Sequence, residues 1–159
     1  MAAPGGLAHL DAQGAARMVD VSAKDVTVRE ATATGRVRVS PAVVAALRGV
    51  GVPKGDALAV ARVAGIAAAK RTPELIPLAH PVAVHAVSVD LQVEQGEVRI
   101  SATVRTADRT GVEMEALTCV SVAALTLVDM VKALDRATVI TDIRLEAKSG
   151  GRSGTWTRP

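Results

Sequence analysis

The sequence of 159 residues contains neither phenylalanine nor tyrosine, and its one tryptophan, Trp156, lies close to the C-terminus. Aliphatic side chains must therefore build the core, and small ones bury little area each. We expect closely packed helices, or contact with another subunit, to supply the buried area that small side chains do not. Proteins that bind single-stranded nucleic acid usually stack bases on aromatic rings, so the composition argues against a nucleic-acid partner.

Cysteine and histidine are also scarce. The single cysteine, Cys119, excludes an internal disulfide bond, and with only three histidines a zinc site built from Cys and His is not expected. The N-terminus lacks the charged and apolar segments of a signal peptide. The uncharged stretch 116–128 is too short to span a bilayer. We therefore expect a cytoplasmic protein without a membrane partner and without a metal site of its own.

What is present is aliphatic and mildly basic. Hydrophobic residues make up 49% of the chain and charged residues 22%, which is typical of a folded protein, and the length predicts one domain. The net charge of +3 leaves two interpretations open. It reflects either a solvated surface with a slight excess of Lys and Arg or a pocket for an anionic ligand.

Alternation of apolar and polar residues predicts the strands. The clearest case is a β-hairpin over 87–105 with one buried face. A strand with an irregular middle is expected over 26–39, and a last strand over 138–145. Residues 18–22 are expected to form a short strand or an ordered arm.

Caps and apolar faces predict three helices. Ser40 caps a helix that ends near Arg48, and Asp56 caps a second that ends near Lys70. A long helix over about 112–134 is apolar nearly all round, so it must be buried on most sides. This order of elements indicates an α+β sandwich, with helices packed on one face of a mostly antiparallel sheet.

Two motifs set an ionisable side chain beside Gly or Pro. In Lys54-Gly55-Asp56, the glycine allows a ligand to approach, and the lysine and the following helix N-terminus favour an anion; a loop lysine and a capping aspartate would explain the motif equally well. His80 lies between Pro77 and Pro81, which biases it towards extended backbone. A histidine held in this way is either a general acid/base or a residue of a surface loop.

Further acidic groups are open to two interpretations. Thr110 and Glu113 have the spacing of a capping box, whereas Glu113 and Glu115 can share one site only if their segment is extended. Asp129 and Lys132 share a helical face. They form either an exposed ion pair or an acid/base pair with shifted pKa values.

Seven longer stretches stand out along the chain: 18–24 (MVDVSAK), 54–56 (KGD), 64–72 (AGIAAAKRT), 75–81 (LIPLAHP), 110–118 (TGVEMEALT), 129–133 (DMVKA) and 147–154 (AKSGGRSG). In this order and spacing they closely resemble the molybdenum cofactor biosynthesis protein C family, the cyclic pyranopterin monophosphate synthases. The resemblance covers roughly residues 9–154, and several long motifs together are far more specific than any one. Ala79 stands where relatives often have Cys, and Arg152 where some have Lys.

The resemblance implies a ferredoxin-like fold and a phosphorus-oxygen lyase of molybdenum cofactor biosynthesis. Its substrate would be (8S)-3′,8-cyclo-7,8-dihydroguanosine 5′-triphosphate, made by an upstream radical SAM enzyme, and its products cyclic pyranopterin monophosphate and pyrophosphate. No cofactor is expected, although a divalent cation such as Mg²⁺ can accompany the triphosphate. The implied assembly is a homohexamer, a trimer of dimers with sites at subunit interfaces. We expect residues 1–8 to be disordered, 9–154 to form a single catalytic domain and 155–159 to be a C-terminal tail.

The resemblance also implies roles for residues at matching positions. The catalytic residues would be Asp129, Lys54 and Lys132. The substrate-binding residues would be Leu78, Ala79, His80, Glu113, Met114, Glu115 and Lys148, with the segment 111–115 extended. The main alternative is a non-catalytic paralogue that acts as an oligomeric scaffold, and the retained lysines, His80 and Asp129 argue against it. A module that only binds anionic ligands or nucleic acid is a more distant alternative.

Overall fold

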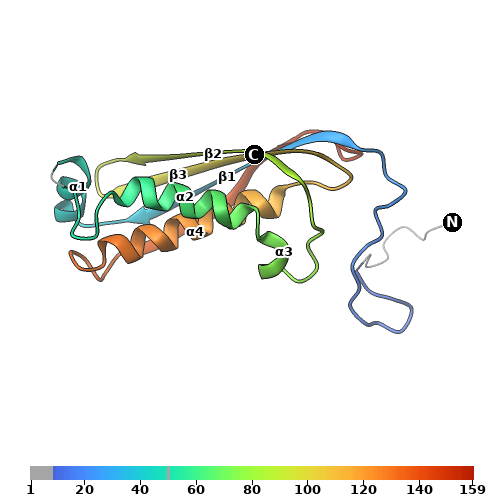
Figure 1. Ribbon diagram of the computed structural model, residues 1–159, viewed down its shortest axis with the longest axis horizontal. Coiled ribbons are helices and arrows are strands. Elements are labelled where there is room, and N and C mark those ends of the chain that lie inside the picture. Colours follow the sequence, from blue (N-terminus) through green and yellow to red (C-terminus); the bar gives the residue numbers. More distant parts are fainter. Residues whose placement is uncertain (1–8, 50) are drawn as a thin grey trace.

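A computed structural model describes residues 9–49 and 51–159. The disorder expected for residues 1–8 lies outside this range. The described chain forms two layers, a five-stranded sheet and the helices that cover one of its faces (Figure 1). Its strands are β1 (Thr27–Arg38), β2 (Val84–Val93), β3 (Glu97–Asp108), β4 (Val139–Ser149) and β5 (Trp156–Thr157). Its helices are α1 (Pro41–Arg48), α2 (Ala57–Ala69), α3 (Thr72–Leu75) and α4 (Glu113–Val131).

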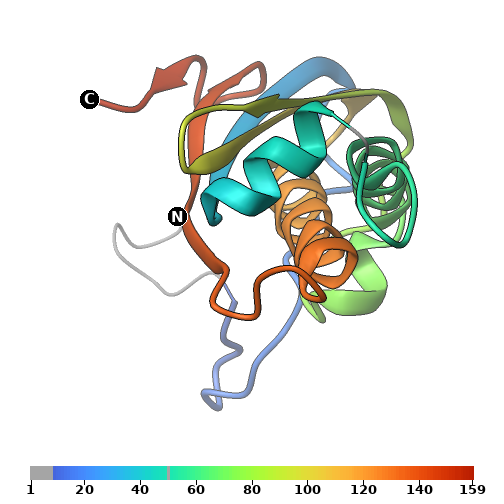
Figure 2. The ribbon, with the colours of Figure 1, turned by 90° about the vertical axis from the view of Figure 1, so that its left-hand side faces the viewer.

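The strand order is β2-β3-β1-β4-β5, and every neighbouring pair is antiparallel. The chain reaches β2 from β1 through α1, α2 and α3, and reaches β4 from β3 through α4. Each crossover therefore skips one strand, which is the split β-α-β arrangement of ferredoxin-like folds. The predicted α+β class, antiparallel sheet and one-sided helices are confirmed, and Figure 2 shows α2 and α4 end-on beneath the sheet.

The hairpin strands and β4 are longer than the sequence predicted, whereas β1 is two residues shorter and, on one side, more regular. β1 pairs with β3 without interruption from Thr27 to Arg38, so its expected irregular middle is absent from that side. The register shifts instead on the β4 side, between Thr32 and Ala33 and again after Thr34. β4 continues to Ser149 rather than ending near residue 145.

The core lies between the sheet and the two long helices. Its side chains are small, including Ala31 and Ala33 of β1 and Ala123 and Ala124 of α4. The layers approach closely, because a Cβ on Gly35 of β1 would lie 2.7 Å from a methyl of Val120. α4 is long and apolar enough to cross a membrane. However, 56% of its apolar stretch is buried inside the fold, as in a core helix.

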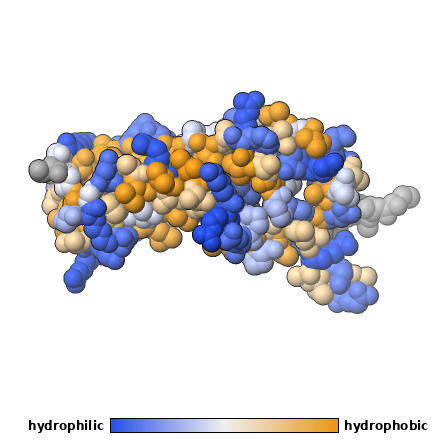
Figure 3. Space-filling view, viewed as in Figure 1, coloured by the Kyte–Doolittle hydropathy of each residue, from blue (hydrophilic) through white to orange (hydrophobic). Residues whose placement is uncertain are grey.

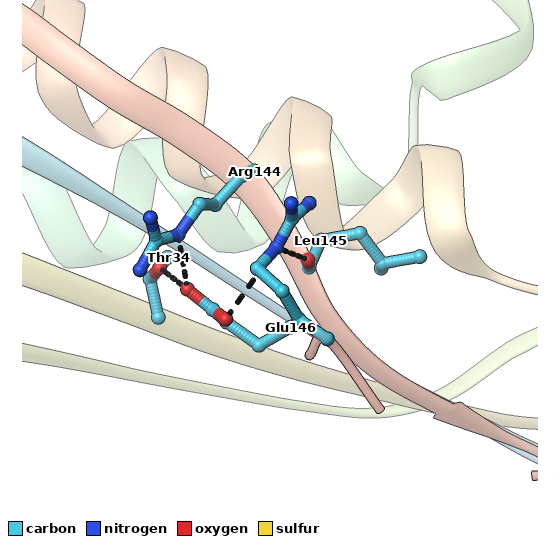
Figure 4. Close-up of polar contacts among 5 residues, drawn as sticks. Thr34, Arg144, Leu145 and Glu146 are labelled. Carbon is cyan, nitrogen blue, oxygen red and sulfur yellow. Dashed lines mark hydrogen bonds and ion pairs between the residues drawn. The ribbon is translucent and has the colours of Figure 1, made fainter. Parts of the chain in front are cut away.

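The other face of the sheet is polar and holds the C-terminal strand in place. Glu146 of β4 accepts hydrogen bonds from Thr34 Oγ1 at 2.6 Å and from Arg144 Nε at 2.7 Å (Figure 4). Arg158 donates to the Leu145 carbonyl at 2.7 Å, and Trp156 and Thr157 pair with β4 as β5. Part of the expected C-terminal tail is therefore a strand of the sheet.

Arginine side chains cover carbonyl groups along the β2 edge. Arg62 of α2 donates to the Val89 carbonyl at 3.0 Å, and Arg48 donates to the Val93 carbonyl at 2.8 Å. A bare strand edge is a template for pairing with another chain, and these side chains occupy part of it. In Figure 3, apolar side chains gather in a band along this view of the molecule, and α2 exposes Val60 and Val63.

Candidate active site

Three charged side chains meet where the C-terminal end of α4 approaches the turn before α2. Asp129 Oδ2 lies 2.8 Å from Lys54 Nζ, and its Oδ1 lies 2.7 Å from Lys132 Nζ. Lys132 follows the last turn of α4, one helical turn after Asp129. Lys54 is placed by a tight turn in which Gly55 has a φ of 105°, a left-handed value that favours glycine. The structure thus joins the three residues to which the family resemblance assigns a catalytic role.

The electrostatics of this cluster fix the state of its carboxylate. The hydrogen bonds from Lys132 and Lys54 lower the pKa of Asp129 to about 2. All three side chains remain about half exposed, at 42% for Lys54, 53% for Asp129 and 56% for Lys132. Each ammonium has three N–H donors, so both lysines keep protons that can reach a ligand. Asp56, the third member of the Lys54 motif, caps α2 by accepting the Ala59 N–H at 3.0 Å.

A second charged group lines a pocket of about 490 Å³ beside the first turn of α4. Its four cations, Lys24, Arg29, Lys148 and Arg152, outnumber its three acids, Asp25, Glu30 and Glu113. Lys148 lies 3.1 Å from Glu113 Oε1 and donates to Ser153 Oγ at 2.8 Å. Several cations around one open pocket favour an anionic ligand, which is the second of the two interpretations that the net charge left open.

The segment around Glu113 is helical, so the expectation that 111–115 is extended is wrong. α4 begins at Glu113, and its N-cap is Val112, which offers no side-chain hydrogen bond. The capping box suggested by Thr110 and Glu113 is not formed, because the Glu113 carboxylate turns to Lys148 instead. Glu113 and Glu115 therefore point to different sides of one helical turn.

The neighbours of Glu113 have contrasting exposure. Met114 is exposed, whereas only 2% of Glu115 is accessible to solvent. Burial raises the pKa of the Glu115 carboxyl to about 7. A hydrogen bond from the Glu115 backbone N–H opposes this rise, and the charge of Glu113 adds to it. Glu115 can thus hold or release a proton near neutral pH.

The predicted Leu78-Ala79-His80 segment lies in the loop after α3. Leu78 is exposed, and Ala79 and His80 are half-buried. The imidazole Nε2 of His80 makes a hydrogen bond with the carbonyl oxygen of Val19, in the segment that precedes β1. His80 therefore has a long-range partner that no local pattern revealed.

The two charged groups stand at opposite ends of α4. Glu113 and Asp129 are separated by sixteen residues of helix, or about 24 Å at a rise of 1.5 Å per residue. Within one chain the structure therefore unites Lys54, Asp129 and Lys132, and separately Glu113 and Lys148, but does not bring the two groups together.

Sequence reasoning missed two cations of the pocket. Lys24 follows the short arm at 18–22, and Arg29 alternates with apolar residues in β1, so each has the pattern of an ordinary surface side chain. Only the tertiary fold brings them to Lys148. In the described part of the chain, no group of three or more His, Cys, Asp or Glu side chains is arranged to hold a metal ion.

Comparison with known proteins gives a consistent result over nearly the whole chain. A model of the MoaC family matches residues 18–151. The chain is 69% identical to a cyclic pyranopterin monophosphate synthase of Nocardioides, over 98% of both chains. It is 69% identical to that of Streptomyces coelicolor, over 96% of this chain and 89% of the relative. It is 60% identical to cyclic pyranopterin monophosphate synthase 2 of Mycobacterium tuberculosis, over 97% and 92%.

Proposed function

The chain belongs to the MoaC family, and we propose from this premise that it is a cyclic pyranopterin monophosphate synthase of molybdenum cofactor biosynthesis. It converts (8S)-3′,8-cyclo-7,8-dihydroguanosine 5′-triphosphate to cyclic pyranopterin monophosphate and pyrophosphate. The observation that carries the proposal is the contact of Asp129 with both Lys54 and Lys132. A carboxylate that stays ionised between two ammonium groups can hold both in place, and their N–H donors remain available to a charged substrate.

The reaction sets two chemical demands. The purine-derived ring must open and close again as a pterin, which moves protons at several atoms. A sugar hydroxyl must then attack the α-phosphorus, forming a P–O bond as the bond to the β-phosphate oxygen breaks and pyrophosphate leaves. Lys54 and Lys132 would exchange protons with the ring atoms, Asp129 would hold both ammonium groups in place, and cations near the phosphates would stabilise the developing charge.

The pocket at the other end of α4 is suited to the triphosphate. Lys24, Arg29 and Arg152 surround it together with Lys148, whose ammonium group is already held by Glu113 and Ser153. Arginine and lysine are the usual partners of phosphate oxygens. A divalent cation such as Mg²⁺ would enter with the triphosphate rather than occupy a site prepared by the protein.

A complete site would require two copies of the chain. One substrate must meet both the phosphate pocket and the Lys54 cluster, yet these lie about 24 Å apart along α4. An antiparallel neighbour could place its Lys54 cluster beside the pocket. We propose that this occurs in a homohexamer, a trimer of dimers, and that the apolar side chains exposed on α2 are covered there. We further propose that the enzyme works in the cytoplasm and receives its substrate from a radical SAM enzyme.

The test is to incubate the purified protein with the cyclised dihydroguanosine triphosphate and to measure two products, pyrophosphate and the fluorescent pterin formed on oxidation. We expect both in equal amounts. Loss of turnover in Lys54→Ala and Asp129→Ala, with the oligomer intact, would assign the activity to this site. A folded oligomer that binds the substrate and forms neither product would instead be a scaffold paralogue.

A further inference from the structure

The segment before β1 extends away from the two-layer body and contacts it at His80. We call residues 9–26 the N-terminal arm. Figure 1 shows it as an extended blue trace on the side of the molecule that holds α3. Within the described part of the chain, two side-chain hydrogen bonds tie the arm to the body. His80 Nε2 bonds with the Val19 carbonyl, and Arg109 Nε donates to the Lys24 carbonyl at 3.0 Å.

The Val19 carbonyl is positioned by turns that follow it directly. Asp20 Oδ1 accepts the Ser22 N–H at 2.8 Å, and the Lys24 N–H donates to the Val21 carbonyl at 3.0 Å. An aspartate that bonds the backbone two residues ahead forms an Asx turn, which restricts the chain around it. The acceptor that meets His80 is therefore built into an ordered turn.

This hydrogen bond decides which nitrogen of His80 carries a proton. A backbone carbonyl can only accept, so Nε2 must be the N–H donor. In a neutral imidazole the other nitrogen, Nδ1, then has a free lone pair. Across residues 9–49 and 51–159, the structure gives Nδ1 no hydrogen-bond partner.

We propose that the N-terminal arm is a positioning element for His80, and that it leaves Nδ1 as the imidazole atom that exchanges a proton with the substrate. The identity of that substrate rests on the proposed function, whereas the tautomer does not. In the reaction, Nδ1 takes a proton from a substrate N–H or O–H and becomes part of an imidazolium ion. Nε2–H stays on the Val19 carbonyl, and the proton on Nδ1 is later returned to the substrate.

The arm also places a carboxylate near the ring. The Asp20 carboxylate lies close enough to His80 for an electrostatic interaction, which lowers the pKa of Asp20 in addition to the larger effect of its hydrogen bonds with Ser22. One turn of the arm therefore orients the ring through Val19 and sets a negative charge near it.

The first experiment measures the tautomer directly, in the intact protein without substrate. The protein is labelled with ¹⁵N at histidine, and His80→Gln identifies the His80 signals among those of His9 and His85. We expect Nε2 at the chemical shift of a protonated ring nitrogen and Nδ1 at that of an unprotonated one. The reverse pattern would overturn the proposal. No turnover is required, so the result stands even if the proposed reaction is not observed.

A pair of Asp20 variants then tests whether the arm imposes the tautomer. Asp20→Ala removes the Asx turn, whereas Asp20→Asn keeps an oxygen that can accept the Ser22 N–H. We expect the alanine variant to mix the two tautomers and the asparagine variant to keep the Nε2–H form. An unchanged tautomer in Asp20→Ala would show that the arm does not position His80.

Substitution of His80 separates anchoring from chemistry. The glutamine of His80→Gln can still donate to the Val19 carbonyl, but it has no acid/base group at the position of Nδ1. We expect it to lower kcat while trypsin cleaves the arm at Arg17 and Lys24 no faster than in the unsubstituted protein. His80→Ala should lower kcat and also release the arm. Trypsin should then cleave the arm roughly two- to tenfold faster, the factor expected from the loss of one hydrogen bond. Full kcat in His80→Gln would contradict the proposal.

Discussion

A Cβ atom placed on Gly65 of α2 would lie 2.9 Å from the carbonyl oxygen of Cys119 on α4 and 3.1 Å from its sulfur. At this point the backbone of Gly65 packs directly on the carbonyl and sulfur of Cys119 and on the methyl of Ala123. A core without phenylalanine or tyrosine fills its volume by such close approach. The glycine is therefore a packing residue, although it lies inside a helix where glycine is intrinsically unfavourable.

Gly65 gives the first prediction. Gly65→Val should destabilise the fold by about 1–3 kcal/mol through overpacking, which lowers the melting temperature by roughly 2–4 °C per kcal/mol for a chain of this size. Gly65→Ala should change stability less, because a better helix propensity offsets part of the overlap. Thermal unfolding measures both. Ala45→Val, at an exposed position of α1, is the control, and an equal loss there would show that packing on α4 is not the cause.

The Lys54, Asp129 and Lys132 cluster predicts how activity depends on pH. The lysines lower the pKa of Asp129 to about 2, so Asp129 is ionised throughout the range in which the enzyme works. Its ion pairs contribute stability above its ordinary pKa near 3.8, and that contribution is lost as the pH falls towards 2. We therefore expect no loss of kcat from Asp129 protonation above pH 4, and Asp129→Asn should be inactive at every pH. A pH profile of kcat in which Asp129→Asn regains activity at low pH would refute this.

Buried Glu115 predicts a pH-dependent stability. Its folded-state pKa, about 7, lies above the ordinary value of 4.5, so it favours the folded state fully below pH 4.5, and this advantage is lost as the pH rises towards 7. A shift of this size corresponds to about 3 kcal/mol. Glu115→Gln should flatten the curve of unfolding free energy between pH 5 and pH 8. Denaturant unfolding at several pH values measures it, and an unchanged slope in the variant would assign the effect to another group.

Substitutions of the two partners in the Glu113 and Lys148 ion pair should have opposite effects on anion binding. Glu113→Gln removes a negative charge from a pocket lined by cations, so it should bind pyrophosphate more tightly. Lys148→Ala should bind it more weakly, and added salt should weaken binding in both. Isothermal titration calorimetry measures the affinities. Glu74→Gln, which disrupts an exposed ion pair with Arg71 outside the pocket, should leave them unchanged.

Most of the fold was accessible from periodicity, whereas the details of the site were not. The hairpin and the long helix follow from strong repeats of period two and from an almost uniformly apolar run. The start of α4 was predicted to within one residue, whereas the extended segment 111–115, which the resemblance implied, was wrong. The real partner of Glu113 is Lys148, which is distant in sequence and is brought near by β4.

The residues of the site divide in the same way. Asp129 and Lys132 are three apart on one helix, so their contact could be predicted from spacing. Lys54 joins them across 75 positions of sequence, and only its resemblance to a family motif suggested it. Arg29 carried no signal at all, because one arginine in an alternating strand looks like any solvent-facing residue. Long-range pairing is set by tertiary structure, which a single sequence does not encode as a local pattern.

The length of α4 has a consequence for inheritance. In the proposed shared site, α4 keeps the phosphate pocket and the Lys54 cluster of one chain apart, so a damaged chain would lose one half of a site and still supply the other half. Chains carrying Lys54→Ala and chains carrying Lys148→Ala, each inactive alone, should regain part of the activity when they are unfolded, mixed and reassembled. In a cell that carries both alleles, the two defects would complement each other, whereas two alleles damaged at the same end of α4 would not.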